Sequence, residues 1–284
     1  MLAIVIRLLG YRKETERVKK KGLRILAAAA VLTFGCLTMN AYAAEGWALS
    51  NNIWTYLDKN GNRVTNEWKK GADNLWRYLN NSGEMAVNSW ADNDYYVDAN
   101  GIMVADKWMQ IVSPYSRDSQ TYWFYFGSSG KVTKDTWKKI DGKSYYFDAD
   151  GIMQTGWTED GDYYLSSSGA MVTGWRYLEP KDEDSSLYGP ESDDGKYWFY
   201  FSTSGKKQSP STSDDGGDYK VTKIDGKYYC FDADGRMRTG WVYLDGDPEN
   251  SSKNSIADWR YFAESGIQNA TVGAAISGWL SLNP

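Results

Sequence analysis

The chain of 284 residues contains no histidine. Histidine is the side chain most often used as a general acid or base near neutral pH, so its absence removes a large class of catalytic sites. The sequence also has no nucleophile elbow, no cluster of metal-ligating residues and no stretch outside its repeats that is long enough for a catalytic domain. We therefore expect a protein that is not an enzyme, with no catalytic residue, no metal site and no cofactor.

Cysteine is almost absent as well. There are two, Cys36 and Cys230, and Cys36 lies in a segment expected to be removed. A single remaining cysteine cannot form an intrachain disulfide, and Cys230 sits among aromatic residues where it is expected to pack rather than react. Stability must come from packing.

Long apolar runs are also lacking, apart from one near the N-terminus. Eight Lys and Arg residues between Arg7 and Arg24 precede an apolar run from Ile25 to Leu37, which Ala41-Tyr42-Ala43 follows. This order is typical of a secretory signal with cleavage before Ala44. The leader ahead of it is unusually long, so we expect translation to start downstream of Met1. An uncleaved membrane anchor is the alternative, although the run is shorter than the ~20 residues that span a bilayer; a lipoprotein modified at Cys36 fits the preceding residues poorly.

Positive charge is scarce in the exported part. Without residues 1–44 the counts fall from 32 Lys and Arg and 37 Asp and Glu to 24 and 35, which is a formal net charge of −11. An acidic chain is a poor partner for nucleic acid or anionic lipid. It is compatible with a cationic or neutral ligand.

Aromatic residues, in contrast, recur with a period of about 20 residues. The stretch from Trp137 to Trp157, WKKIDGKSYYFDADGIMQTGW, holds a Trp, a turn at Asp141-Gly142, an aromatic run, a second turn ending at Gly151, a Met and the next Trp. Asp-Gly between aromatic segments favours a tight hairpin, because glycine accepts the positive φ that such a turn needs. One unit is therefore predicted to be one β-hairpin.

Nine units follow this pattern. Their second-turn glycines are Gly61, Gly83, Gly101, Gly130, Gly151, Gly169, Gly205, Gly235 and Gly266. A Tyr, or once Cys230, lies five residues before each glycine, and a Leu, Val or Phe lies four before it. Adjacent strand residues face opposite ways, so these two columns lie on opposite faces of each hairpin.

The position seven residues before the glycine varies. It holds an additional Trp in five units and Asp94, Ser144 or Asp162 in three others. A Trp absent from some units without loss of the repeat is a candidate for ligand binding, although the alternative is that all the aromatic columns form the core. The predicted organisation is a leader and secretory signal over 1–44, β-hairpin repeats over 45–266, and a C-terminal cap or irregular tail over 267–284. The predicted fold is all-β, a solenoid of about nine β-hairpins preceded by a helical signal segment.

The repeats, for example IDGKYYCFDADGRMRTGW ending at Trp241, resemble the choline-binding or cell-wall-binding repeat family of Gram-positive surface proteins. The resemblance covers about residues 46–266 and extends to glucan-binding repeats and to receptor-binding repeats of clostridial toxins, which bind saccharides. It implies a left-handed superhelix of hairpins with ligand sites between consecutive hairpins, each walled by two Trp of one repeat and an aromatic of the next.

Carried over position by position, the resemblance gives four full Trp pairs with an aromatic partner from the following repeat. The predicted ligand-binding residues are Trp47 with Trp54 and Tyr78, Trp68 with Trp76 and Tyr96, Trp108 with Trp123 and Tyr146, and Trp175 with Trp198, which is followed by Cys230 or its neighbour Tyr229. A fifth pair, Trp241 with Trp259, lacks a regular next repeat. Where Asp94, Ser144 and Asp162 replace the second Trp, the sites are expected to be empty or to take a sugar.

Taken together, the sequence predicts an exported, secreted protein retained non-covalently at the cell wall or cell surface. The expected partner is a choline-bearing teichoic acid or a similar wall polysaccharide, because many weak aromatic sites on one chain gain avidity for a polymer. No nucleic-acid partner is expected, and no feature of the sequence indicates an oligomeric state. A saccharide-binding module of adhesin or toxin type is the alternative function. The DADG turns at Asp148 and Asp232 resemble part of a calcium loop but lack its distal glutamate, so plain turns are expected.

Overall fold

The computed structural model describes residues 45–115, 119–181, 194–210, 219–244, 259–264 and 271–276. The predicted signal segment lies outside these residues. The chain divides into two compact units, Met1–Lys134 with Asp150–Ile152 and Asp135–Ala149 with Met153–Pro284, called unit 1 and unit 2 below. All regular structure in the described residues is β; they contain no helix, and therefore none that could cross a membrane.

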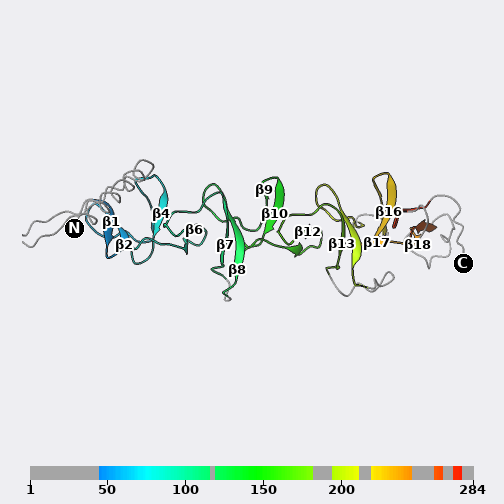
Figure 1. The fold of residues 1–284 in the computed structure, drawn as a ribbon, viewed down its shortest axis with the longest axis horizontal. Helices are drawn as coiled ribbons and strands as arrows, with labels where there is room; N and C mark the ends of the chain where they lie inside the picture. Colours follow the sequence, from blue (N-terminus) through cyan, green and yellow to red (C-terminus); the bar gives the residue numbers. More distant parts are fainter. Residues whose placement is uncertain are drawn as a thin grey trace, which may run out of the picture. The chain divides into compact units, whose positions relative to one another are not determined.

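The strands come in sequential antiparallel pairs, one of which, β15–β16, is extended by a short third strand, β17 (Figure 1). Those of unit 1 are β1 (Gly46–Ser50), β2 (Ile53–Leu57), β3 (Glu67–Lys70), β4 (Trp76–Leu79), β5 (Ser89–Ala91), β6 (Tyr95–Val97), β7 (Lys107–Val112) and β8 (Thr121–Phe126). Those of unit 2 are β9 (Thr136–Ile140), β10 (Lys143–Phe147), β11 (Gly156–Trp157), β12 (Tyr164–Leu165), β13 (Gly174–Leu178), β14 (Tyr197–Phe201), β15 (Tyr219–Ile224), β16 (Lys227–Asp232), β17 (Met237–Arg238), β18 (Gly240–Tyr243) and β19 (Trp259–Phe262). The hairpin prediction is confirmed for the described residues, whereas the solenoid and its number of repeats stay predictions.

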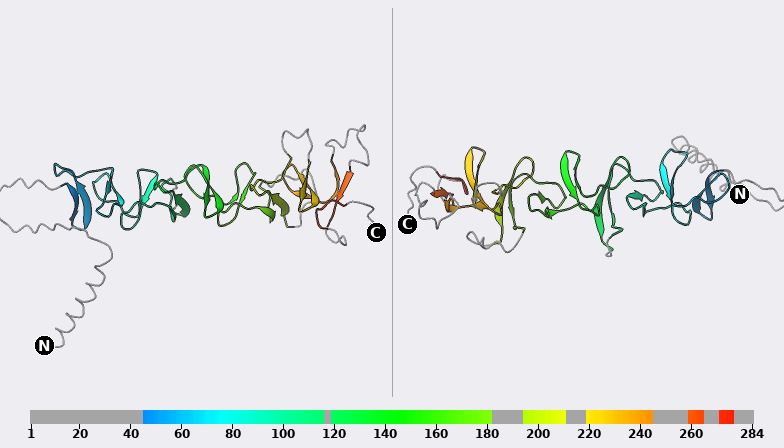
Figure 2. Two further views of the ribbon diagram at one scale, coloured as in Figure 1. Left: turned by 90° about the horizontal axis from the view of Figure 1, so that it is seen from above. Right: turned by 180° about the vertical axis from the view of Figure 1, so that it is seen from behind.

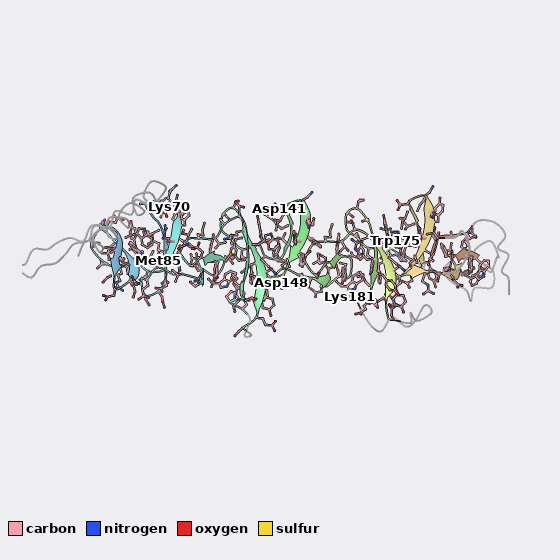
Figure 3. The ribbon with its side chains drawn as sticks, in the orientation of Figure 1. Lys70, Met85, Asp141, Asp148, Trp175 and Lys181 are labelled. Atoms are coloured by element: carbon pink, nitrogen blue, oxygen red, sulfur yellow. The ribbon has the colours of Figure 1, made fainter. Side chains whose placement is uncertain are left out.

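The turn chemistry is the one expected. Asp141 and Gly142, between β9 and β10, both have positive φ (48° and 81°), as a primed two-residue turn requires. Asp225 and Gly226 repeat this geometry between β15 and β16. Figure 3 places Asp141 at the tip of its hairpin. The DADG segment at Asp232 is also a turn, in which the Gly235 N–H donates to the Asp232 carbonyl oxygen at 2.8 Å.

The register pairs the first Trp of each hairpin with the Tyr column. Trp68 is opposite Tyr78, Trp137 opposite Tyr146 and Trp175 opposite Tyr200. In the eighth hairpin Val221 takes the place of the Trp and is opposite Cys230. Cys230 is buried, and burial raises its pKa to about 12, so it packs as a small apolar side chain.

The core is the column four residues before the turn glycine. Its fully buried members are Leu79, Val97, Phe126, Phe147, Leu165, Phe201, Phe231 and Phe262. All of these except Phe262 also pair through the backbone with the residue two positions after that glycine, as Phe147 does with Met153. The Tyr column is mostly half-buried, because it faces the opposite side of the hairpin.

One turn glycine differs from the prediction. Gly266 lies outside the described residues, and Gly273 fills the role of ninth glycine: its φ is 77° and Ala275, two residues later, bridges to Phe262. Gly273 stands eleven residues after Phe262 instead of four, so the spacing from Trp259 does not locate it. The segment from Thr271 to Ile276 thus completes a hairpin unit, although it falls within the predicted tail.

Candidate functional site

The candidate site lies on the hairpin face that carries the first Trp. In the β13–β14 hairpin, Trp175 is opposite Tyr200, and Trp198 precedes Tyr200 by two residues on the same strand. Residues two apart on a strand share a face, so Trp175 and Trp198 are diagonal neighbours. Figure 2 shows the hairpins of the chain from two further sides.

Two Trp pairs have nearly the same geometry. Trp108 and Trp123 have ring centroids 6.3 Å apart with planes at 83°, and Trp175 and Trp198 are 6.4 Å apart at 83°. Trp123 and Trp198 remain 43% and 42% exposed. Each pair therefore forms an open corner of two perpendicular indole rings, one of which faces solvent.

A third wall comes from the next repeat. The ring centroid of Tyr229 lies 4.8 Å from that of Trp175, and the ring centroid of Phe231 lies 5.8 Å from it. Figure 3 labels Trp175 beside the strands of unit 2 that carry these residues. Likewise Tyr95 lies 5.4 Å from Trp68. The contacting aromatics stand six and four residues before the next glycine.

The third aromatic was predicted five residues before the glycine, and the structure shows a different neighbour for that position. Tyr78, Tyr96 and Tyr146 pack instead against the first Trp of their own hairpins, with centroids 5.1, 5.8 and 5.4 Å away. The reason is strand alternation: a residue at this position faces the same way as its own Trp.

The first predicted pair, Trp47 with Trp54, has a different environment. The Trp47 indole Nε1 donates to the carbonyl oxygen of Lys70 in the next hairpin at 3.0 Å. Six residues before the next glycine stands Arg77, paired with Asp73 at 2.7 Å, so no aromatic is available there as a third wall.

The second pair is Trp68 with Trp76. Trp76 is 40% exposed, and the Lys70 ammonium lies 4.9 Å from its ring centroid. Figure 3 labels Lys70 near the tip of the β3–β4 hairpin and Met85 toward its base. Trp68 contacts Tyr95 on the next hairpin, so this junction offers Trp68, Trp76 and Tyr95 as aromatic surfaces.

The fifth pair is the most exposed one. Trp241 contacts Tyr261 at 5.2 Å and Trp259 contacts Tyr243 at 5.3 Å, each across the β18–β19 hairpin. Trp241 is 59% exposed.

An open cleft of about 370 Å³ lies where Ser144 replaces the second Trp. Trp137, Tyr146, Thr158, Glu159 and Asp160 line it. Burial and the nearby Asp135 carboxylate raise the pKa of the Tyr146 hydroxyl, which donates to Asp135 at 3.3 Å. This cleft therefore combines aromatic faces with hydroxyl and carboxylate groups.

The Met of the repeat has a packing role. A Cβ added to Gly205 would meet the Met171 sulfur at 2.3 Å, and one added to Gly169 would meet the Met153 sulfur at the same distance. The Met of one repeat therefore lies on the turn glycine of the next. Among the described residues no group of three or more Cys, Asp or Glu side chains could hold a metal ion.

The family model of the choline-binding repeat matches residues 44–90 and 132–174. Both stretches belong to the choline-binding repeat family. They contain the first two Trp pairs and the Trp137 cleft of this chain. No curated protein sequence matches the chain.

Several solved structures are similar to the chain. The modular autolysin LytC from Streptococcus pneumoniae is 24% identical over 76% of this chain and 51% of that chain, with a TM-score of 0.40. The choline-binding domain of CbpL from the same organism is 24% identical over 72% and 91%, with a TM-score of 0.47. Choline-binding protein F, also from S. pneumoniae, is 21% identical over 84% and 81%, with a TM-score of 0.48. The chain spans about half of the length of LytC.

Proposed function

We propose that this chain is an exported, non-catalytic protein that binds choline residues of wall polymers such as teichoic acids through its exposed Trp pairs. The observation that carries this function is the corner formed by Trp175 and Trp198, which Tyr229 of the next repeat closes at 4.8 Å from Trp175. The family match of residues 44–90 and 132–174 supports the same ligand.

The chemistry of the corner suits a quaternary ammonium group. Such a cation has no N–H to donate, and aromatic rings attract it through the negative potential of their faces. Each ring contributes about 0.5–2 kcal/mol, depending on how far the cation is desolvated. Two or three rings therefore give a weak single site, and several sites on one chain give a polymer useful avidity.

The acidic charge of the exported part supports a cationic ligand as well. The described residues contain exposed carboxylates beside the aromatic columns, for example Glu159 next to Trp137. A negative surface raises the local concentration of a cation without holding it in a fixed place.

The test is a choline titration of the mature protein followed by Trp fluorescence, with Trp198→Ala as the site variant. We expect the wild type to respond at millimolar choline and the variant to lose part of the response while its melting temperature changes little. Trp157→Ala is the matched control for stability, because Trp157 is enclosed by Tyr164, Phe199 and Phe201. A wild-type protein that neither responds to choline nor binds a quaternary-amine resin would disprove the proposal.

Saccharide binding is the second candidate, favoured by the cleft at Trp137. An indole face that stacks on a sugar ring, with the exposed Glu159 carboxylate beside it, offers both apolar contact and hydrogen bonds. Binding of a wall glycan that Trp137→Ala abolishes and that saturating choline leaves unchanged would support this function. Competition by choline would instead place both ligands in one class of site.

A further inference from the structure

Two repeats carry an aspartate at the variable position, and both aspartates pair with lysines of the next repeat. Asp162 lies 3.0 Å from the Lys206 ammonium. Asp94 lies 3.1 Å from Lys131 and 2.9 Å from Lys134. These ion pairs connect successive hairpins at the position where other repeats present a Trp.

A second lysine strengthens the contact between the sixth and seventh repeats. Lys207 stands two residues after Gly205, where most repeats have Met. Its aliphatic stem packs on Gly235, because a Cβ added to Gly235 would lie 2.7 Å from Lys207 Cδ. The Met side chains of other repeats pack on the turn glycines in the same way. Its ammonium lies 5.3 Å from the Trp157 ring centroid, a cation–π contact.

The ammonium of Lys207 is drawn into the junction rather than extended into solvent. Burial lowers the pKa of Lys207, which is the effect expected for a partly desolvated cation. Trp157 is fixed by a hydrogen bond from its Nε1 to the Glu179 carbonyl oxygen at 2.9 Å. The Trp157 ring is thus held in place, and an ammonium group of the chain itself lies over its face.

The next junction provides a direct comparison. Trp175 has two aromatic neighbours on the following hairpin, Tyr229 and Phe231, as Trp157 has Phe199 and Phe201. The Trp157 junction and the Trp175 junction differ at two other positions. Trp198 corresponds to Asp162, and Met237, which packs against the cluster containing Trp175, corresponds to Lys207.

We propose that the junction of Asp162, Lys206, Lys207 and Trp157 is a self-occupied site, in which ammonium groups of the chain replace the ligand cation and exclude choline. The junction at Asp94 shares the ion pairs, with Lys131 and Lys134, but there the Lys134 ammonium lies over the Tyr115 ring and Val132 takes the place of Lys207. The inference rests on the proposed choline function, because it divides the junctions into those open to the ligand and those closed to it. The physical basis is that one aromatic face is already used by Lys207 and a second cation there would be repelled.

The decisive variant is Asp162→Trp with Lys207→Met, which gives this junction the residues of the Trp175 junction at both positions. The two changes cancel in net charge, so general attraction of cations is unaltered. Equilibrium dialysis of the full exported chain with labelled choline should show one more bound choline per folded molecule than in the wild type. The reverse variant, Trp198→Asp with Met237→Lys, should bind one choline fewer than the wild type. It tests the same inference if the first variant does not fold.

The matched control is Asp141→Asn with Lys143→Met, which is also neutral in net charge and lies at the exposed tip of the β9–β10 hairpin. It should leave the number of bound cholines unchanged. Near-UV circular dichroism and thermal melting establish that each variant is folded.

The outcomes separate the inference from the proposed function. If the wild type binds choline and the opened variant gains no site, the self-occupied junction is refuted while choline binding stands. If the wild type binds none and the opened variant binds one, the proposed function fails and the internal cation explains why this junction is closed. If neither binds, both are overturned.

Discussion

The backbone N–H of Met85 donates a 2.7 Å hydrogen bond to the carbonyl oxygen of Trp54 in the preceding hairpin. The same bond runs from Met103 to Trp76 at 2.9 Å and from Met171 to Ser144 at 2.8 Å. The acceptor is always the variable position, but the bond uses only its main chain. Successive hairpins are therefore joined through this position whichever side chain it carries, which leaves that side chain available for other roles.

The first prediction follows for the β3–β4 hairpin. Trp76→Ala should weaken the choline response and change stability little, because the Trp76 side chain is exposed and its carbonyl still accepts from Met103. Leu79→Ala, in the same strand and fully buried, should cost about 2–5 kcal/mol of unfolding free energy. Fluorescence titration and thermal melting of both variants in one buffer measure the two effects. Equal losses of stability would make Trp76 a structural residue.

The second prediction concerns the turn glycines. Gly205 and Gly142 have similar positive φ, 83° and 81°, but a Cβ at Gly205 would meet Met171 whereas one at Gly142 would meet nothing within 4 Å. Gly142→Ala should cost roughly 1–2 kcal/mol from backbone strain alone. Gly205→Ala should cost more, since Met171 must also move. Urea unfolding of both variants tests this, and equal costs would contradict the packing role of the Met.

Much of the fold can be read from the sequence, and the reason is local. Alternation and the Asp141-Gly142 type of turn determine hairpins and their register, including the Val221–Cys230 pair, because each involves residues close in the chain. The position of Gly273 could not be read, because additional residues between Phe262 and this glycine change the spacing while Phe262 still pairs with the residue two positions after the glycine.

The candidate site was less accessible to sequence reasoning. Tyr95 was not predicted as a third wall, and Tyr229 was named only as the alternative to Cys230, although alternation contains the signal: the face opposite the Tyr column is the one that meets the preceding hairpin. The Lys207 contact with Trp157 could not be found by pattern alone, because it depends on how a long side chain crosses between repeats.

The third prediction is a pH effect at Asp94. The hydrogen bond from Lys134 holds the pKa of Asp94 below its ordinary value of 3.8 in the folded protein. A lowered pKa means that the ion pair stabilises the fold above that value and that this contribution is lost as the pH falls below it. Asp94→Asn should therefore lower the melting temperature at pH 7 by a small amount and flatten its decline below pH 4.

The magnitude is small because the pair is partly open to solvent, about 0.2–1 kcal/mol for such pairs. Asp106→Asn is the control: Asp106 is exposed, and its φ of 48° suits asparagine equally well. Melting curves between pH 2 and 7 compare the three proteins. If Asp106→Asn flattens the decline of the melting temperature below pH 4 as much as Asp94→Asn does, the ion pair is not the cause of the effect.

The fourth prediction concerns export. The basic segment, the apolar run to Leu37 and the Ala41-Tyr42-Ala43 sequence should direct secretion with cleavage before Ala44. Mass spectrometry of the protein recovered from the cell surface should give an N-terminus at Ala44, and choline should release it from choline-bearing walls. Full-length protein found only in the cytosol would disprove export.

The last prediction concerns the junction at Trp47. The Lys69 ammonium lies 5.1 Å from the Tyr56 ring centroid and 2.6 Å from Glu67, so a lysine of the second hairpin occupies an aromatic face of the first. A ligand cation beside it would be repelled, and removing the ammonium should strengthen binding there by about 1 kcal/mol, roughly fivefold in affinity. Lys69→Met should therefore steepen the low-concentration part of a choline titration. The exposed Lys59 provides the control, because Lys59→Met removes the same charge from the same region. If both variants bind choline equally, the gain comes from net charge and the aromatic face of Tyr56 has no part in it.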